Sequence, residues 1–364
     1  MNVEREIVDA LLHWYWEEKR DLPWRMDRDP YKIWISEIML QQTRVEAVKP
    51  YYERFLARFP DIRTVAEANE QDLLKMWEGL GYYSRVKNIQ KAAQTIVEHY
   101  GGEMPREYED VITLPGIGEY TAGAIMSIAY NRPYPAVDGN VLRVFARWYN
   151  LDLDVTKTKS KQYIGRLVSD SIPDGYASDF NQSLMDLGAT ICIAKYPKCD
   201  ICPTSKWCKG YIDGRQAVLP VKAPKKPPVI VHVALARVKM NHNILIEQRP
   251  NQGLLADMWQ FPMAEGNDPT DARDQLQKYL QVHYPTVCLT EQVLCTEEHI
   301  FSHRHWMATV YHGEINRVNE QAVLYREGEE NADNRLLFKW IAHSQLKNYP
   351  LPKIYHKIIA KIDR

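Results

Sequence analysis

The sequence predicts a multi-domain chain, with a first domain made of helices and a second of the α+β class. Two observations support this fold class. Apolar residues recur at helical spacing through most of the chain as far as residue 187, and from residue 229 they alternate as in half-buried strands. The chain has 364 residues, 45% of them hydrophobic, which is enough for two or three separate cores.

The first domain contains a series of amphipathic helices. One of them has a clear start, because Asp29 is a good N-cap and Pro30 suits the first helical position. Apolar stripes at helical spacing predict the others. The predicted helices cover residues 4–19, 31–48, 50–59, 71–77, 84–100, 108–114, 120–129, 141–148 and 179–193.

The second domain begins after a change of composition. Residues 209–228 lack apolar periodicity and contain four prolines, which is typical of a partly extended linker. We therefore divide the chain into a helical domain (1–215), a linker (216–228) and a second domain (229–364). The predicted strands of the second domain are 229–238, 244–248, 287–294 and 306–312, and its predicted helices are 271–279 and 352–362.

Composition limits the class of protein. No run of 18 or more apolar residues is present, so we expect neither a signal peptide nor a membrane span. We expect an intracellular protein. The formal net charge of −1 means that any binding of nucleic acid would depend on a local basic surface.

A glycine-rich turn precedes the predicted helix 120–129. Gly116 and Gly118 lie where the backbone must approach a neighbour closely or take a positive φ. Amide groups at the mouth of a helix form an anion site, although such a turn is equally consistent with a plain connection between helices. Asp138 follows twenty residues later, at the start of the predicted helix 141–148.

Four of the six cysteines lie within seventeen residues: Cys192, Cys199, Cys202 and Cys208. Cysteines crowded in this way in a reducing compartment indicate metal or cluster ligation rather than disulfides. Four thiolates suit tetrahedral zinc or a 4Fe-4S cube, and ligand number does not separate the two. Lysines between the ligands make this loop either a positive finger for a phosphate backbone or simply a solvated loop. Cys288 and Cys295 receive no ligand role.

The segments LPGIGEYTAGAI and VDGN resemble the helix-hairpin-helix base-excision glycosylases, and nearly the whole chain is similar to the MutY family of adenine DNA glycosylases. The resemblance implies an all-α glycosylase domain with a helix-hairpin-helix at about 108–129 and an iron-sulfur loop at 192–208. It also implies a Nudix-like recognition domain. The family's spacing of six, two and five residues between cysteines is matched, which implies one 4Fe-4S cluster.

The resemblance also identifies two carboxyl groups. Breaking the N-glycosidic bond of adenine requires a proton on the leaving base and a negative group facing the oxocarbenium-like sugar. A Glu among apolar side chains keeps its proton, whereas an Asp at a helix N-terminus keeps its charge. From the residues alone, Glu37 could lie on the solvated side of its helix and Asp138 could be a simple N-cap. The matching stretches WISEIMLQQT and VDGN imply that Glu37 is the acid and that Asp138 stabilises the sugar cation.

The family's DNA-contacting and pocket positions carry over residue by residue. Gln42, Leu80 and Tyr82 would enter the base stack, while Gly116 and Gly118 would contact the backbone. Trp24, Arg25 and Gln182 would line the adenine pocket, since a glutamine amide reads the N6 and N7 edge of adenine. The implied partner is double-stranded DNA with an A:8-oxoguanine or A:G mispair. The resemblance also implies a monomer in the bacterial cytoplasm or nucleoid. Without the family, Gln42 is an ordinary helical glutamine and Tyr82 a core tyrosine.

Two departures from related families restrict the activity. Glycosylases that also cleave the strand place a lysine nucleophile where this chain has Tyr120, so strand cleavage should be absent or weak. We expect the Tyr120 hydroxyl to hydrogen bond near Asp138. The second domain lacks the paired glutamates of an RExxEE helix, which excludes pyrophosphatase activity. It does contain Phe301, Ser302 and His303, which match the family's 8-oxoguanine loop and would otherwise be an ordinary turn.

The sequence therefore predicts a monofunctional enzyme that hydrolyses the N-glycosidic bond of mispaired adenine and leaves an abasic site. One alternative is an endonuclease III-like glycosylase and lyase, which Tyr120 and the second domain disfavour. Another is a non-catalytic iron-sulfur DNA-binding protein, which the pair of Glu37 and Asp138 argues against.

Overall fold

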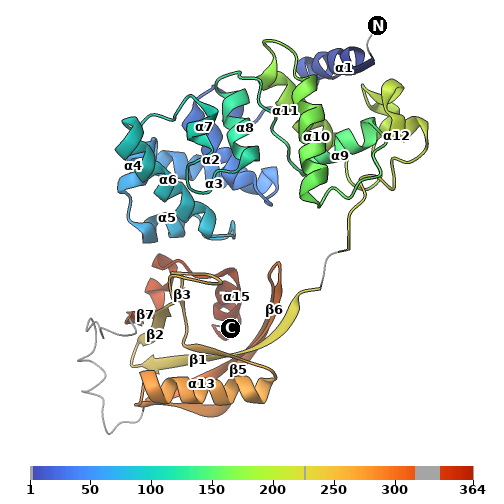
Figure 1. Ribbon diagram of the computed structural model, residues 1–364. Helices are drawn as coiled ribbons and strands as arrows, with labels where there is room; N and C mark the ends of the chain where they lie inside the picture. Colours follow the sequence, from blue (N-terminus) through green and yellow to red (C-terminus); the bar gives the residue numbers. More distant parts are fainter. Residues whose placement is uncertain (1–2, 225–226, 316–336, 364) are drawn as a thin grey trace. The chain divides into compact units, whose positions relative to one another are not determined.

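The computed structural model describes residues 3–224, 227–315 and 337–363. Contacts divide the chain into two compact units, one of Met1–Ala68 with Asn88–Pro224 and the other of Asn69–Lys87 with Lys225–Arg364. The first unit is helical and the second contains a mixed sheet (Figure 1), so the predicted fold class is confirmed. No described helix is long and apolar enough to span a bilayer.

Most of the predicted helices of the amino-terminal half form with small changes at their ends. Asp29 caps the second helix as expected, since its carboxylate accepts hydrogen bonds from the backbone N–H groups of Tyr31 and Lys32. Three further helices, α4, α10 and α12, lie where no separate helix was predicted. The α-helices are α1 (Val3–Glu18), α2 (Pro30–Leu40), α3 (Val45–Arg58), α4 (Ile62–Glu67), α5 (Glu70–Met76), α6 (Ser84–Tyr100), α7 (Tyr108–Val111), α8 (Glu119–Ile128), α9 (Gly139–Trp148), α10 (Thr158–Ser171), α11 (Ala177–Thr190) and α12 (Lys209–Ile212).

The prediction of one helix over residues 31–48 is wrong. Helix α2 ends at Leu40 and α3 begins at Val45, with a tight turn between them. Gln42 has a φ of 58° in this turn, a left-handed conformation that a right-handed helix cannot contain. Gln42 therefore belongs to a loop rather than to a helix face.

The predicted linker is partly packed against the helical unit. The buried side chain of Arg147 donates a hydrogen bond of 3.0 Å to the carbonyl of Leu219, which is itself buried. Val221 continues this contact through a β-bridge to Asp154. Within the predicted linker of residues 216–228, positions 225–226 lie outside the described residues.

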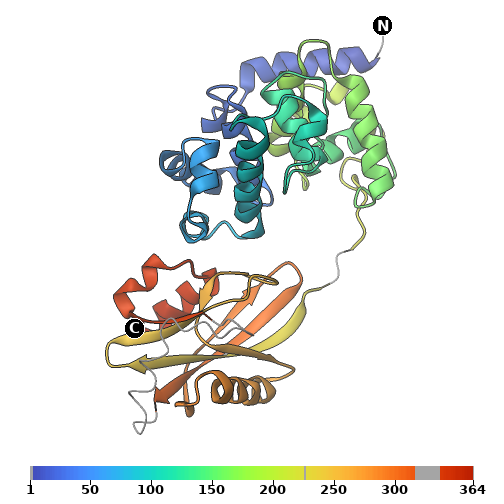
Figure 2. The same ribbon diagram turned by 60° about the vertical axis from the view of Figure 1, so that its left-hand side comes forward.

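The sheet of the second unit lies between two helices. Within the described residues, seven strands form this sheet, in the order β3-β2-β1-β6-β5, with β4 paired to β1 and β7 to β2. Alternation along β1 explains the two layers, because Val233 and Leu235 pack toward α15 while Ala234, Ala236 and Val238 pack toward α13. Figure 2 shows α13 and α15 on opposite faces of the sheet. The elements are β1 (Val229–Met240), β2 (Asn243–Gln248), β3 (Trp259–Gln260), β4 (Met263–Gly266), α13 (Pro269–His283), β5 (Val287–Ile300), β6 (Arg304–Ile315), β7 (Phe338–Ala342) and α15 (Lys353–Ile362).

Strand β5 extends six residues beyond the predicted strand that ends at residue 294. Its pairing with β6 shifts register between Leu289 and Val293 and again between Val293 and Cys295. Such bulges interrupt the alternation of side chains between the two faces of the sheet. The alternating pattern of apolar residues therefore stops at the bulges, although the strand itself continues.

Residues Asn69–Lys87 pack with the sheet in the second unit. The Glu78 carboxylate accepts hydrogen bonds from the backbone N–H of Leu351 at 2.8 Å and from Nε2 of His356 at 3.0 Å. Trp259 donates from its ring N–H to the Gln71 side chain at 2.9 Å. These contacts hold the turn that follows Glu78, which contains Leu80 and Tyr82.

Helix α8 requires glycine at its centre. A Cβ on Gly123 would lie 2.1 Å from the carbonyl oxygen of Pro135, so Gly123→Ala should destabilise the protein, by about 1–3 kcal/mol in the free energy of unfolding. Gly165→Ala in α10 is the matched control, because its Cβ meets nothing within 4 Å and the substitution should be neutral or stabilising. Urea denaturation of both variants measures the difference, and equal midpoints would contradict the close contact.

Candidate active site

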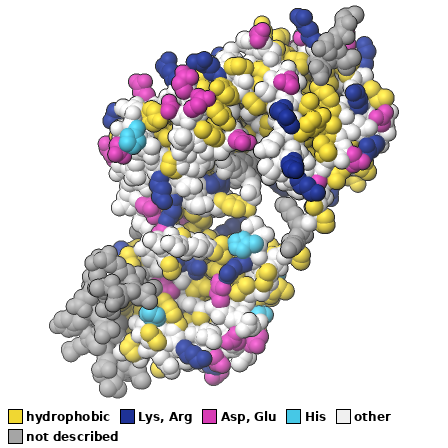
Figure 3. All heavy atoms as spheres, viewed as in Figure 1, with side chains coloured by type: hydrophobic (Ala, Val, Ile, Leu, Met, Phe, Trp, Pro, Cys, Tyr) yellow, Lys and Arg dark blue, Asp and Glu magenta, His cyan; other side chains and the backbone are white. Residues whose placement is uncertain are grey.

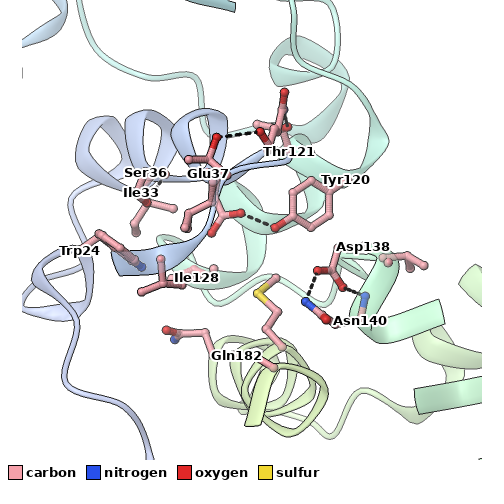
Figure 4. Close-up of a pocket in the computed structure, with 18 of the residues that line it drawn as sticks. Trp24, Ile33, Ser36, Glu37, Tyr120, Thr121, Ile128, Asp138, Asn140 and Gln182 are labelled. Carbon is pink, nitrogen blue, oxygen red and sulfur yellow. Dashed lines mark hydrogen bonds between the residues drawn. The ribbon is translucent and has the colours of Figure 1, made fainter. Parts of the chain in front are cut away.

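A pocket of about 790 Å³ opens between α2, α8, the N-terminus of α9, α11 and the loop before α2. It brings together most of the residues that the sequence analysis assigned to catalysis and to base recognition. Its lining includes Trp24, Arg25, Glu37, Gln42, Gly118, Tyr120, Asp138 and Gln182. Figure 4 shows Glu37 and Tyr120 pointing toward one another, with Asp138 and Asn140 on the neighbouring helix start.

Glu37 lies on the buried side of α2. Its exposed fraction is 4%, and nearly every residue of α2 around it is buried, which rules out a solvated helix face. Burial raises the pKa of Glu37 to about 7. The hydrogen bond from Tyr120 and the charge of Arg25 oppose this increase, and the charge of Asp138 adds to it. The raised pKa agrees with the expectation from its apolar neighbours.

Tyr120 donates its hydroxyl to Oε2 of Glu37 in a short hydrogen bond. The hydrogen bond is thus made to Glu37 and not to Asp138 itself, although Asp138 is close enough for its charge to raise the pKa of Tyr120. Helix α8 packs on α2, which places the phenol of Tyr120 against Glu37, and the oxygens of Asp138 already accept from Asn140 and Val141.

Asp138 is the N-cap of α9, as the sequence predicted. Its Oδ1 accepts from the backbone N–H groups of Asn140 and Val141, each at 2.8 Å, and its Oδ2 accepts from the Asn140 amide at 2.7 Å. Burial raises the pKa of Asp138, while these hydrogen bonds favour the ionised form and oppose the increase. The two carboxyls thus differ in their partners, since Glu37 accepts from a neutral phenol and Asp138 accepts three N–H bonds.

The sequence analysis missed the residues that orient Asp138. Arg143 donates to the Asn140 side-chain oxygen at 2.8 Å and to the Gly188 carbonyl at 2.7 Å, which fixes the amide that contacts Asp138. Arg143 and Arg147 are both buried on α9. Two arginines four residues apart within an apolar helical stripe were a usable signal, because such residues are seldom buried without partners.

Of the two glycines in the turn before α8, only Gly116 has a backbone conformation that requires glycine. Gly116 has a φ of +77°, and a Cβ there would lie 2.6 Å from Cβ of Asn88. Gly118 has an ordinary φ of −103°, and a Cβ there would meet nothing within 4 Å. Gly118 is the N-cap of α8 and offers no side-chain cap to the first N–H groups of the helix.

The three predicted base-pocket residues all line this pocket. Trp24 is 7% exposed and packs edge-on against Tyr52. The Gln182 amide donates to the Ser178 hydroxyl at 3.1 Å. Arg25 forms an ion pair of 2.7 Å with Asp186, a residue that the sequence analysis did not identify.

The other predicted contact residues lie in the second unit. Leu80 is only 8% exposed, whereas Tyr82 is 46% exposed and has a φ of 50°. Phe301, Ser302 and His303 form the turn between β5 and β6, with the Phe301 ring packed on Trp306 and with Ser302 and His303 exposed.

All four clustered cysteines line a second pocket of the helical unit. Cys192 Sγ accepts a hydrogen bond of 3.3 Å from Arg147, and Cys202 Sγ lies 3.3 Å from the Thr204 hydroxyl. In the described part of the chain, no three Cys, His, Asp or Glu side chains converge closely enough to hold a single metal ion. The four thiols nevertheless line one pocket, so they lie in the same part of the helical unit.

Comparison with known proteins identifies the family. A model described as an HhH-GPD superfamily base excision DNA repair protein matches residues 35–170, and a NUDIX domain model matches residues 233–361. The mouse adenine DNA glycosylase is 36% identical over 347 residues, covering 80% of this chain and 67% of the relative. The enzyme of Buchnera aphidicola subsp. Acyrthosiphon pisum is 38% identical over 255 residues, covering 69% of this chain and 72% of the relative.

Among solved structures, a thermostable thymine-DNA glycosylase superposes with a TM-score of 0.54 at 31% identity, covering 58% of this chain and 97% of its own. An endonuclease III–DNA complex superposes with a TM-score of 0.50 at 23% identity, covering 59% of this chain and 100% of its own, which supports the fold. Fold and site together define a helix-hairpin-helix DNA glycosylase with a Nudix-like domain. The chain belongs to the adenine DNA glycosylase family of base excision repair. It is a hydrolase of N-glycosyl bonds that acts on DNA, as the sequence predicted.

Proposed function

We propose that this enzyme removes adenine mispaired with 8-oxoguanine or guanine from double-stranded DNA and leaves an abasic site without cleaving the strand. The observation that carries the proposal is the placement of two unlike carboxyls in one pocket. Glu37 is buried beside a phenol and has a pKa near 7, whereas Asp138 accepts three N–H bonds. An acid and an anion with separate environments are what cleavage of a glycosidic bond requires.

In the proposed mechanism, protonated Glu37 donates its proton to a ring nitrogen of adenine. The electron pair of the C1′–N9 bond then leaves with the base, and the Asp138 carboxylate stabilises the resulting oxocarbenium-like sugar. Water adds to C1′ and returns a proton to Glu37, which restores the enzyme. Tyr120 contributes a hydrogen bond to Glu37 but no amine, so no Schiff base forms at this position.

The extruded adenine would lie between Trp24, Arg25 and Gln182, where an amide can pair with its N6 and N7 edge. Gln42 and the exposed ring of Tyr82 would enter the base stack. Leu80 is buried, so we assign it the support of this turn rather than insertion. The open N-terminus of α8 at Gly118 would bind a backbone phosphate together with the turn at Gly116.

A local basic surface supports DNA binding despite the near-neutral total charge. Lys159, Lys161 and Arg166 belong to α10, and Figure 3 shows Lys and Arg side chains over this helix. Lys161 also lines the 790 Å³ pocket, so the basic residues border the site of chemistry. Such side chains position the duplex through its phosphates and carry no sequence information.

Catalysis and recognition of the lesion are assigned to different domains. Residues 1–215 would supply the chemistry, residues 216–228 the connection, and residues 229–364 the recognition of 8-oxoguanine. The exposed turn of Phe301, Ser302 and His303 supports this assignment, because a hydroxyl and an imidazole can pair with the altered edge of the lesion.

The acid and anion roles predict the effects of two isosteric substitutions. Glu37→Gln and Asp138→Asn should each lower the single-turnover rate of adenine excision by on the order of a hundredfold or more, because each removes a proton or charge that the transition state needs. Binding of the mispaired duplex should change little. Glu53→Gln, on an exposed part of α3, is the control.

Excision near the wild-type rate in either variant would refute that role. Borohydride added to wild-type reactions tests the absence of lyase chemistry, since a trapped protein–DNA adduct would contradict the monofunctional assignment.

The cysteine loop predicts one 4Fe-4S cluster, bound by Cys192, Cys199, Cys202 and Cys208. Purified protein should be brown and should contain equal amounts of iron and acid-labile sulfide. Cys199→Ser should lose visible absorption, whereas Cys288→Ser, at an exposed position of β5, should retain it. A colourless protein containing zinc would overturn the assignment.

The recognition turn predicts a change of preference rather than of chemistry. Replacing Ser302 and His303 together with alanine should shrink the ratio of excision rates opposite 8-oxoguanine and guanine, by roughly 1–3 kcal/mol of lost discrimination. His242→Ala, in the exposed turn between β1 and β2, should leave the ratio unchanged. An unaltered ratio in the double variant under single-turnover conditions would remove this turn from recognition.

A further inference from the structure

A buried carboxylate on α11 joins two arginines of the pocket wall. The Asp186 side chain is 1% exposed. It accepts from Nε and Nη2 of Arg20 at 2.8 and 2.6 Å, and from Nη1 and Nη2 of Arg25 at 2.7 and 2.8 Å. The Arg20 backbone N–H adds a fifth bond at 3.2 Å. We call these three residues the arginine clamp.

The arginine clamp holds the loop that carries Trp24. Arg20 and Arg25 lie on either side of Trp24 in the loop between α1 and α2, and both line the pocket with Trp24. The short helical turn of Pro23–Arg25 has no side-chain cap of its own. Its attachment to α11 therefore depends on Asp186, because the residues on both sides of Trp24 bind the same carboxylate.

The clamp also balances charge near Glu37. The groups that face Glu37 are Tyr120 from α8, Asp138 from the start of α9 and Arg25 from the loop. Arg25 in turn faces Asp186 from α11 and the ring of Tyr15 from α1, with its Cζ 5.7 Å from the ring centroid. Among these groups, Arg25 is the one cation that acts on Glu37. Asp186 is the anion that compensates the charge of Arg25.

We propose that Asp186 is a positioning residue for adenine excision: it fixes the loop around Trp24 and prevents the full positive charge of Arg25 from acting on Glu37. This inference rests on the proposed role of Glu37 as general acid. Asp186 itself makes no contact with Glu37, so its effect passes through Arg25.

The direction of the effect follows from the charges. Excision requires protonated Glu37, so on the alkaline side of the profile the wild-type rate should fall as pH rises through about 7. On the acid side the rate should fall where Asp138 becomes protonated, because the mechanism needs its carboxylate. In Asp186→Asn the charge of Arg25 is no longer compensated, and a nearby cation favours the ionised form of Glu37. The fall should therefore occur at lower pH, with a tenfold loss of rate at alkaline pH for each unit by which the midpoint moves.

The test is the pH profile of single-turnover adenine excision by the full-length protein. Asp186→Asn should move the alkaline midpoint to lower pH, and Asp186→Glu, which keeps the charge, should restore most of the wild-type profile. Asp179→Asn is the matched control on the same helix, because Asp179 accepts a hydrogen bond from Trp16 and makes none with Arg20 or Arg25. A wild-type midpoint in Asp186→Asn would overturn the proposal.

Removing one member of a buried ion pair can unfold a protein, so a second variant keeps the test decisive. Asp186→Asn combined with Arg25→Gln removes both charges, and its midpoint should lie at or above that of the wild type. A midpoint below the wild type in this double variant would overturn the proposal as well. If Glu37→Gln remains active, the proposed acid role fails; if Glu37→Gln is inactive but the midpoint in Asp186→Asn is unmoved, only the role of Asp186 fails.

Discussion

The structure of the pocket depends on the exclusion of water from one carboxyl group, that of Glu37. Glu37 can retain a proton near neutral pH only because α2 is buried along most of its length and packs on α8. That packing needs small residues, and Gly123 allows the backbone at Pro135 to lie against α8. The segment that leads to Asp138 begins directly after Pro135. Helix α8 therefore contacts both the helix that carries Glu37 and the segment that leads to Asp138.

A single helix connects the pocket to the cysteine loop. Helix α9 begins at the cap formed by Asp138, and its Arg143 donates both to Asn140 in the pocket and, at 2.7 Å, to the carbonyl of Cys192. One turn later, Arg147 donates to the carbonyls of Ile193 and Ala194. The two arginines replace water as partners for buried carbonyls, which makes the cysteine loop part of the same rigid unit as the pocket.

Local signals in the sequence were sufficient for much of the fold. The N-caps Asp29 and Asp138 and the helix Ser84–Tyr100 could be read directly, because each depends on neighbours within a few residues. Features that depend on distant residues could not be read in this way. The hydrogen bonds of Asp186 span 161 to 166 positions, and the bond between Tyr120 and Glu37 spans 83. The break at Gln42 had no glycine or proline to mark it.

The packing of Asn69–Lys87 against the sheet has a consequence for how the chain acquires its structure. The polypeptide passes between the two compact units at three points, after residues 68, 87 and 224. During synthesis, the segment with Tyr82 emerges long before Leu351 and His356, which bind Glu78. The hydrogen bonds of the turn itself are local, since Trp77 and Arg85 both donate to the carbonyl of Gly81. The attachment of this segment to Leu351 and His356, by contrast, can form only after nearly the whole chain has been made.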